Sequence, residues 1–265
     1  MSIEFPYRGM PQLSWDVACL GRNREIRGEL YPASAKIKRR AYPVKLLRYW
    51  FMCHFLRIEH QRRQKPLAVC EIGIDRGQMR RFFNSITRDT SGFQVPVASW
   101  SGVDCEVRGN ELQDVGYTSL VEADIETSDA WLDRVCDVTI LLHVLEHLRE
   151  PEKALATMAR GMKPGSVLVG GSPSIPDLFV SVRERQLRQN PHVHSYGHVS
   201  KMSLKRIQRC AAANGLVLEF AAGAFLARLS GSWIEDHRWW LRLNLLFGAL
   251  CPWCSGEIYW VLRKP

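Results

Sequence analysis

The sequence has no long hydrophobic run. Residues 1–21 lack the continuous apolar core of a secretory signal, and the most apolar late stretch, residues 239–250, is interrupted by Arg242 and Asn244. That stretch is also too short for a transmembrane helix. We therefore predict no transmembrane segment and a cytoplasmic location, where the eight cysteines are expected to be reduced thiols.

Acidic residues are scarce between Lys36 and Lys65, where Glu59 stands alone beside ten Lys or Arg residues. The whole chain carries a net charge of +9. The stretch is also rich in large apolar residues, which predicts a basic helix with a broad apolar face. One interpretation is contact with an anionic surface: nucleic acid, a phosphorylated carrier, or the acidic headgroups of a membrane at whose periphery the protein would lie. The other, which we favour, is a lid that packs on the rest of the protein, and nucleic acid is not the preferred partner.

Two common nucleotide-binding motifs are missing as well. Neither the dinucleotide fingerprint G-x-G-x-x-G nor the Lys-Ser/Thr ending of a phosphate-binding loop is present. Instead, the apolar run 67–70 leads into Glu71, Gly73 and Gly77, and a helix-like stretch begins at Gln78. A strand, a tight glycine turn and a helix N-terminus together bring backbone N–H groups close to a ligand.

Strand-like and helix-like segments alternate about every 30 residues, as in βαβ units of a parallel sheet. Four more strands are predicted, at residues 97–103, 117–123, 137–142 and 166–170. The first two end at Asp104 and Asp124. The stretch 137–142, which is the fourth predicted strand of the chain, is an unbroken apolar run, as is typical of a strand buried on both faces.

Five short motifs occur in a characteristic order: Glu71-x-Gly73-x-x-x-Gly77, Gly102-Val-Asp104, Ala123-Asp-Ile125, Leu145-Glu-His147 and Met162-Lys-Pro-Gly165. In this order and spacing they resemble class I S-adenosylmethionine-dependent methyltransferases. The resemblance covers roughly residues 66–220, with a last strand near 257–262. It implies an α/β fold with a doubly wound, mostly parallel seven-stranded Rossmann-like sheet, helices on both faces and an N-terminal helical extension.

The resemblance also implies S-adenosylmethionine as cofactor. Glu71 would meet its amino-acid end, Asp104 its ribose hydroxyls and Asp124 its adenine amine. The full expected set is Glu71, Gly73, Gly77, Asp104, Asp124, Ile125 and Leu142. Asp75 departs from the family, since many members have glycine there, and its carboxylate would repel that of the cofactor unless it points away or binds the amino group. A non-catalytic binding module therefore stays open as an alternative.

Histidines are the candidate residues for binding and deprotonating the molecule that accepts the methyl group. A hydroxyl acceptor needs a proton acceptor near its operating pH, and His143 directly follows the fourth strand. We predict His143 as the catalytic residue, and we predict substrate contacts from His192, His194 and Tyr196, which follow an expected helix at 180–189. The predicted activity is O-methylation of a small molecule or a glycan or lipopolysaccharide-type acceptor.

A metal-dependent or RNA methyltransferase is the alternative within the same chemistry. Some class I members hold a divalent cation with a Glu-x-x-Glu-His motif, and His143, Glu146, His147 and His198 would take that place here. Imidazole ligands favour a softer metal than magnesium. We expect no metal.

Two regions are predicted along the chain. Residues 1–65 form the basic helical extension or lid, and residues 66–265 form the methyltransferase domain. A Trp-rich insertion of about 223–255 precedes the last strand. Five of the nine tryptophans fall between Trp233 and Trp260, which leaves a pocket lid, an interfacial surface or ordinary core packing as interpretations.

Overall fold

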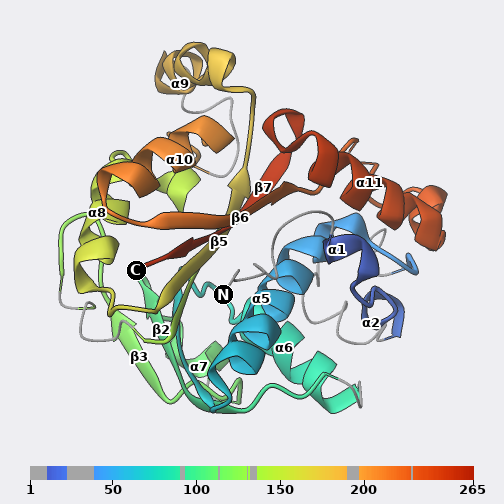
Figure 1. Ribbon diagram of the computed structural model, residues 1–265, viewed down its shortest axis with the longest axis horizontal. Coiled ribbons are helices and arrows are strands. Elements are labelled where there is room, and N and C mark those ends of the chain that lie inside the picture. Colours follow the sequence, from blue (N-terminus) through green and yellow to red (C-terminus); the bar gives the residue numbers. More distant parts are fainter. Residues whose placement is uncertain are drawn as a thin grey trace, which may run out of the picture.

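A seven-stranded sheet forms the centre of the protein. The structure is a computed structural model that describes residues 11–22, 39–89, 93–112, 114–129, 131, 136–189, 197–227 and 229–265. The strand order is β3-β2-β1-β4-β5-β7-β6 (Figure 1). The strands are β1 (Leu67–Ile72), β2 (Val97–Asp104), β3 (Ser119–Glu122), β4 (Val138–Leu142), β5 (Val167–Pro173), β6 (Val217–Gly223) and β7 (Glu257–Arg263). Strands β1 to β5 pair in parallel, while β7 is antiparallel to both β5 and β6. The predicted fold class is confirmed.

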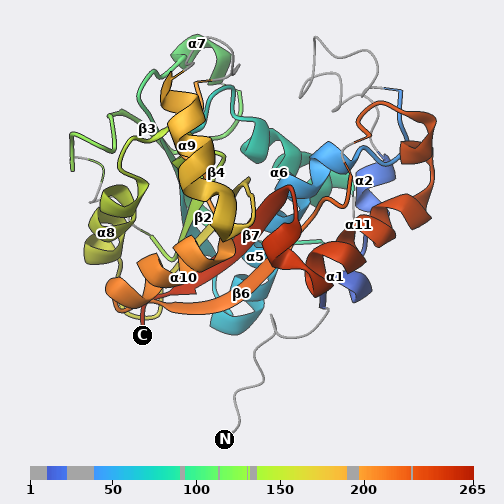
Figure 2. The same cartoon turned by 90° about the horizontal axis from the view of Figure 1, so that it is seen from above.

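Helices cover both faces of the sheet (Figures 1 and 2). One hydrophobic cluster joins the sheet to α5, α6 and α11, and a second joins its other face to α8 and α10. The helices are α1 (Pro11–Ser14), α2 (Cys19–Arg22), α5 (Leu47–Arg63), α6 (Gln78–Asp89), α7 (Gly109–Leu112), α8 (Pro151–Gly161), α9 (Val180–Gln189), α10 (Leu204–Ala213) and α11 (Arg238–Leu250). Short 3₁₀ turns are η1 (Val44–Leu46), η3 (Leu145–His147), η4 (Asp177–Phe179), η5 (Trp233–Asp236) and η6 (Pro252–Cys254).

Local sequence signals explain several helix ends. Pro151 opens α8, where its missing N–H costs no hydrogen bond. The Ser203 hydroxyl caps α10 by accepting the Arg206 N–H at 3.1 Å. Helix α5 ends where Gln64 takes a left-handed conformation two residues before Pro66. Because β1 to β5 are parallel, their carboxyl ends lie at one edge of the sheet.

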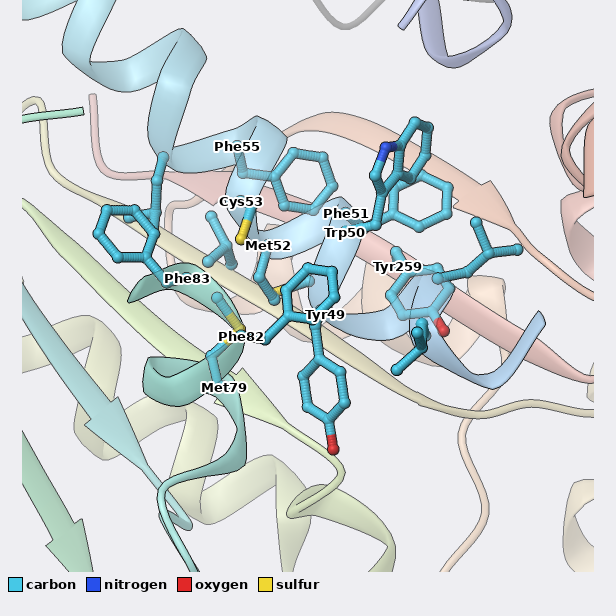
Figure 3. Packing of buried hydrophobic residues seen from close by; sticks show 14 of the residues in the cluster. Tyr49, Trp50, Phe51, Met52, Cys53, Phe55, Met79, Phe82, Phe83 and Tyr259 are labelled. Atoms are coloured by element: carbon cyan, nitrogen blue, oxygen red, sulfur yellow. The ribbon is translucent and has the colours of Figure 1, made fainter. Parts of the chain in front are cut away.

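Helix α5 packs tightly on the sheet, as the lid interpretation expected (Figure 3). Nine of the ten residues 47–56 are buried, all except Arg48. The Phe51 ring stacks on Tyr259 of β7 with ring centroids 4.4 Å apart, and Tyr49 lies 5.5 Å from Phe82 of α6. The helix is therefore covered around most of its circumference. The division between residues 65 and 66 stays a prediction.

Several basic residues of α5 are paired with carboxylates and not left to solvent. Arg48 pairs with Glu257 at 2.7 Å, and Arg62 pairs with Glu219 at 3.3 Å. Arg63 lies 2.8 Å from Asp137 at the start of β4. Because these charges are matched by carboxylates of the sheet, much of the positive charge in 36–65 is used inside the protein. Lys36 and Lys38 lie outside the described residues.

The expected Trp-rich insertion lies between β6 and β7, where η5, α11 and η6 follow one another. Helix α11 touches β6 backbone to backbone, since a Cβ added at Gly248 would lie 1.8 Å from the Gly223 carbonyl oxygen. None of the helices among the described residues has the length and apolar character needed to cross a bilayer.

Candidate active site

The glycine turn after β1 lies against the loop after β4. Gly73 and Gly77 have φ angles of +78° and +68°, which glycine adopts readily. The Gly73 N–H donates to the Val103 carbonyl at 2.8 Å, so the turn is tied to the end of β2. A Cβ at Gly73 would lie 2.3 Å from the Val144 side chain. The chain places β2 and β3 on one side of β1 and then adds β4 and β5 on the other side. This contact therefore lies in the crevice between β1 and β4, where doubly wound folds bind ligands.

Asp104 closes β2 at the same edge. Its Oδ2 accepts the Asp75 N–H at 2.9 Å, and its carbonyl oxygen accepts the Ala123 N–H at 2.8 Å. The side chain is half-buried, and each carboxylate oxygen can accept more than one hydrogen bond. The glycine turn and this carboxylate therefore fit a ligand that carries ribose hydroxyls.

Asp75, the departure from the family pattern, points away from the turn. Its side chain is 61% exposed, and its Oδ1 lies 3.7 Å from Arg108. Its φ of +43° places it in the left-handed region, which Asp tolerates better than most residues. The backbone therefore follows a glycine-like path, while the carboxylate faces solvent and a guanidinium.

Glu71 is buried just before the turn, on the face of β1 that packs toward α6, and its assignment to the amino-acid end of the cofactor stays a prediction. It is only 3% exposed, and its Oε2 accepts hydrogen bonds from the Trp100 indole and the Tyr117 hydroxyl, both at 2.9 Å. Burial raises the pKa of Glu71 to about 7, although the two hydrogen bonds and the nearby Arg80 oppose this. The carboxylate thus links β1 to β2 on the face of the sheet that α6 covers.

The remaining expected cofactor residues lie along the neighbouring strands. Asp124 is exposed, and its Oδ1 accepts the Glu126 N–H at 2.9 Å, which closes the turn after β3. Ile125 is buried in the α8 side of the core, and Leu142 at the end of β4 is half-buried. Leu142 thus ends a strand beside the crevice, Asp124 follows the outer strand β3, and the cofactor roles of Asp124, Ile125 and Leu142 stay predictions.

His143 follows β4 in a left-handed conformation with φ of +59°. Its Nδ1 lies 2.9 Å from Glu146 and its Nε2 lies 3.5 Å from Glu257. Burial and the Arg48 guanidinium lower the pKa of His143, but the two carboxylates raise it more, so the pKa lies above its usual value. The two carboxylates therefore favour the charged form of the ring more than water does.

Sequence reasoning missed Glu257, the first residue of β7. Its side chain is fully buried and joins Arg48, His143 and Tyr259 in one network. Because β7 runs antiparallel beside β5, Glu257 lies opposite Pro173, at the carboxyl edge of the parallel strands. In the sequence, the sign of this residue's role was a single carboxylate at the start of the otherwise apolar strand predicted at 257–262.

Glu146, His147 and His198 form a second cluster, with ligand atoms all within 4.8 Å of one another. The loop before α10 is clasped to η3, because the N–H groups of Val199 and Ser200 donate to the Glu146 carbonyl. Glu146 is fully buried, and its Oε2 has no hydrogen-bond partner. Burial lowers the pKa of His198 to about 4, which the Glu146 carboxylate only partly opposes, so this ring is neutral near pH 7. The predicted substrate residues His192, His194 and Tyr196 lie outside the described residues.

Comparisons with known proteins agree with this geometry. The family described as a methyltransferase domain matches residues 45–219. The N-methyltransferase NodS from Bradyrhizobium japonicum WM9, solved with S-adenosyl-L-homocysteine, is 15% identical; the match covers 94% of this chain and 99% of that one, with a TM-score of 0.51. Magnesium protoporphyrin IX methyltransferase from Synechocystis PCC 6803, also with this product bound, is 12% identical over 91% and 94% of the two chains, with a TM-score of 0.53. No curated protein matches the chain significantly.

The fold and the matched family together define an S-adenosylmethionine-dependent methyltransferase of class I. The chain belongs to the methyltransferase-domain family, and the match begins at Lys45, so it includes helix α5. The resemblance read from the sequence is confirmed, and the alternative of a non-catalytic binding module is set aside.

Proposed function

We propose that this methyltransferase transfers a methyl group to a hydroxyl oxygen of a small-molecule or glycan acceptor. The observation that supports this most directly is His143, held between Glu146 and Glu257 at the carboxyl end of β4. One solved relative is named an N-methyltransferase and the other a magnesium protoporphyrin IX methyltransferase, so the acceptor of this chain is argued from its own residues. A cytoplasmic location is part of the same proposal.

The cofactor side is assigned to the crevice between β1 and β4. When bound, S-adenosylmethionine supplies a methyl group already activated by a sulfonium. The Gly73–Gly77 turn offers backbone N–H groups and close approach, Asp104 accepts ribose hydroxyls, and Asp124 lies at the adenine side. Glu71 keeps the turn in place from below.

The acceptor side is assigned to His143. Its neutral ring would take the proton that the acceptor oxygen loses when the methyl group leaves the sulfonium sulfur and bonds to that oxygen. Glu146 and Glu257 stabilise the imidazolium that results, since opposite charges nearby favour the charged form. The same carboxylates reduce the neutral fraction of the ring at rest, so the acceptor must displace the Nε2–Glu257 contact as it binds.

Removal of the Asp104 carboxylate tests the cofactor side. Asp104→Ala is expected to weaken binding of S-adenosylmethionine by about 1–3 kcal/mol, because hydrogen bonds to a charged acceptor are lost. Calorimetric titration measures this change. The matched control is Glu106→Ala, an exposed neighbour two residues further on whose carboxylate is 74% exposed. Equal affinities for Asp104→Ala and the unaltered protein would reject the assignment.

A divalent-metal-dependent methyltransferase is the second candidate. It is supported by the cluster of Glu146, His147 and His198, and above all by the buried Oε2 of Glu146, which has no hydrogen-bond partner. A carboxylate with two imidazoles suits a transition metal better than magnesium. Such an ion would be held beside His143 and would orient an acceptor hydroxyl there.

Metal analysis separates the two candidates. For the first candidate we expect the purified protein to contain no stoichiometric metal and to keep its methyl-transfer activity after dialysis against a chelator. For the second, one ion per chain is expected, and chelation removes activity that a divalent ion restores. His198→Ala serves as the matched variant, because it removes one ligand of the cluster and leaves His143 with both carboxylates.

A further inference from the structure

Helix α11 carries an apolar stripe on its outer face. Trp239, Leu243 and Leu250 are exposed by 55%, 36% and 54%, and the half-buried Leu246 lies between them in the sequence. Spacings of four, three and four residues place these side chains on one side of a helix. The opposite face is buried and includes Trp240, Leu241, Asn244, Leu245 and Gly248. A helix that is apolar on both faces is normally covered on both.

Exposed tryptophans also flank the helix on both sides in the sequence. Trp233 of η5 is 68% exposed, and Trp253 of η6 is 52% exposed. The His237 ring bridges Trp233 and Trp239, at centroid distances of 5.6 and 6.3 Å. Within the described part of the chain, seven of the eleven exposed large hydrophobic side chains fall between residues 226 and 253. We call Trp233, Trp239, Leu243, Leu250 and Trp253 the tryptophan patch.

The core side of α11 is fixed, so the patch is held outward. Gly248 lies against the Gly223 backbone, and the Asn244 Oδ1 accepts the Leu226 N–H at 3.0 Å. The Arg242 guanidinium donates to the carbonyl oxygens of Leu13 and Trp15 in the N-terminal segment. Figure 2 shows α11 at the outer side of the molecule. The helix therefore cannot turn its stripe inward without losing these contacts.

Beside the patch the carboxylates are paired or buried, and one exposed arginine adds a positive charge. The carboxylates of η5 are engaged: Glu235 is buried and accepts the Val44 and Gly231 N–H groups, and Asp236 pairs with Arg40 at 2.8 Å. Arg238, at the start of α11, is exposed next to Trp239. Together with the net charge of +9, this arrangement suits an anionic partner.

We propose that the tryptophan patch docks on an anionic lipid surface, with α11 lying in the plane of the interface. Tryptophan is enriched at membrane–water interfaces because its ring is apolar and its N–H is polar. Interfacial helices combine an apolar face of Trp and Leu with basic residues. The contact with an anionic surface is thereby assigned to α11 and its flanking turns, whereas from the sequence it was one interpretation of residues 36–65, where a lid was favoured.

Co-sedimentation with vesicles tests the proposal. The full chain is expected to pellet with vesicles of equal parts phosphatidylcholine and phosphatidylglycerol, to bind phosphatidylcholine vesicles more weakly, and to be released in part by salt. The double variant Trp239→Ser with Leu243→Ser is expected to lower the partition coefficient at least about tenfold, because two apolar side chains no longer enter the interface. Equal pelleting of the double variant and the unaltered protein overturns the proposal.

Two further measurements test whether the patch itself enters the lipid. Val217→Ser, at an exposed apolar residue of β6 outside the patch, is the matched control and should bind vesicles as the unaltered protein does. Brominated lipids should quench the fluorescence of the unaltered protein, and most of this quenching should disappear in the triple variant Trp233→Phe, Trp239→Phe and Trp253→Phe. A dimer in sedimentation equilibrium that the double variant abolishes, without any binding to vesicles, would assign the patch to a second copy of the chain and would refute the lipid proposal.

Discussion

Arg263→Met is expected to lower the free energy of unfolding by about 3–5 kcal/mol, the usual cost of removing one partner from a buried ion pair. Arg263 at the end of β7 donates to Glu59 of α5 and Glu219 of β6, at 2.5 and 2.6 Å. The side chains of these two carboxylates are 0% and 3% exposed. Methionine fills a similar volume but leaves both carboxylates buried without the guanidinium that joins them. Denaturant unfolding followed by circular dichroism measures the change.

Arg62→Met is the matched control for this prediction. Arg62 also pairs with Glu219, but its side chain is 36% exposed and the distance is 3.3 Å. Exposed ion pairs contribute about 0–1 kcal/mol, so the control should lose no more than that. If both variants lost the same amount, the buried network would not be what joins α5 to β6 and β7. A large loss for Arg263→Met alone would support the view that the buried ion pairs between α5 and the sheet contribute to the stability of the domain.

His143→Asn is expected to lower turnover by about 10²–10⁴-fold, the range that a general base contributes. Asparagine tolerates the positive φ of this position better than alanine and keeps a donor for Glu146, so the loop should persist. Affinity for S-adenosylmethionine should be unchanged, since the ring is assigned to the acceptor side. Transfer of labelled methyl from S-adenosylmethionine to a metabolite extract measures turnover, and calorimetry measures affinity.

His147→Asn separates the base from the metal interpretation. His147 is exposed and belongs to the possible metal cluster, while the two contacts of His143 do not involve it. A base at His143 predicts that His147→Asn retains turnover. Equal losses of turnover in His143→Asn and His147→Asn would favour the metal cluster. Full activity of His143→Asn would refute the catalytic assignment.

Much of the fold was predictable from local patterns. The glycine turn after residue 72 and the apolar run 138–142 identified β1 and β4, because backbone conformation and burial on both faces leave local signatures. The acidic ends of β2 and β3 followed from the same alternation. Asp104 was predicted at the site because the carboxyl ends of parallel strands meet at one edge, and the structure places it at the end of β2.

Side-chain direction was less predictable. Glu71 was assigned to the cofactor because it stands next to the turn, but it lies on the face of β1 that packs toward α6, where Trp100 and Tyr117 hold it. Successive strand residues point to opposite faces, and only the packing of the sheet decides which face is open. His143 was placed correctly at the end of β4, yet its carboxylate partner Glu257 was not foreseen.

The sequence by itself determined the order of strands and helices, the glycine turn and the methyltransferase class, since each depends on residues close together in the chain. Only the tertiary structure decided which distant charges meet. Arg48 and Glu257 are 209 positions apart, and they pair because β7 inserts between β5 and β6 while α5 packs across the sheet. Packing also decided which face of α11 is buried and left Trp239 exposed. Composition does not predict this, because both faces of the helix are apolar.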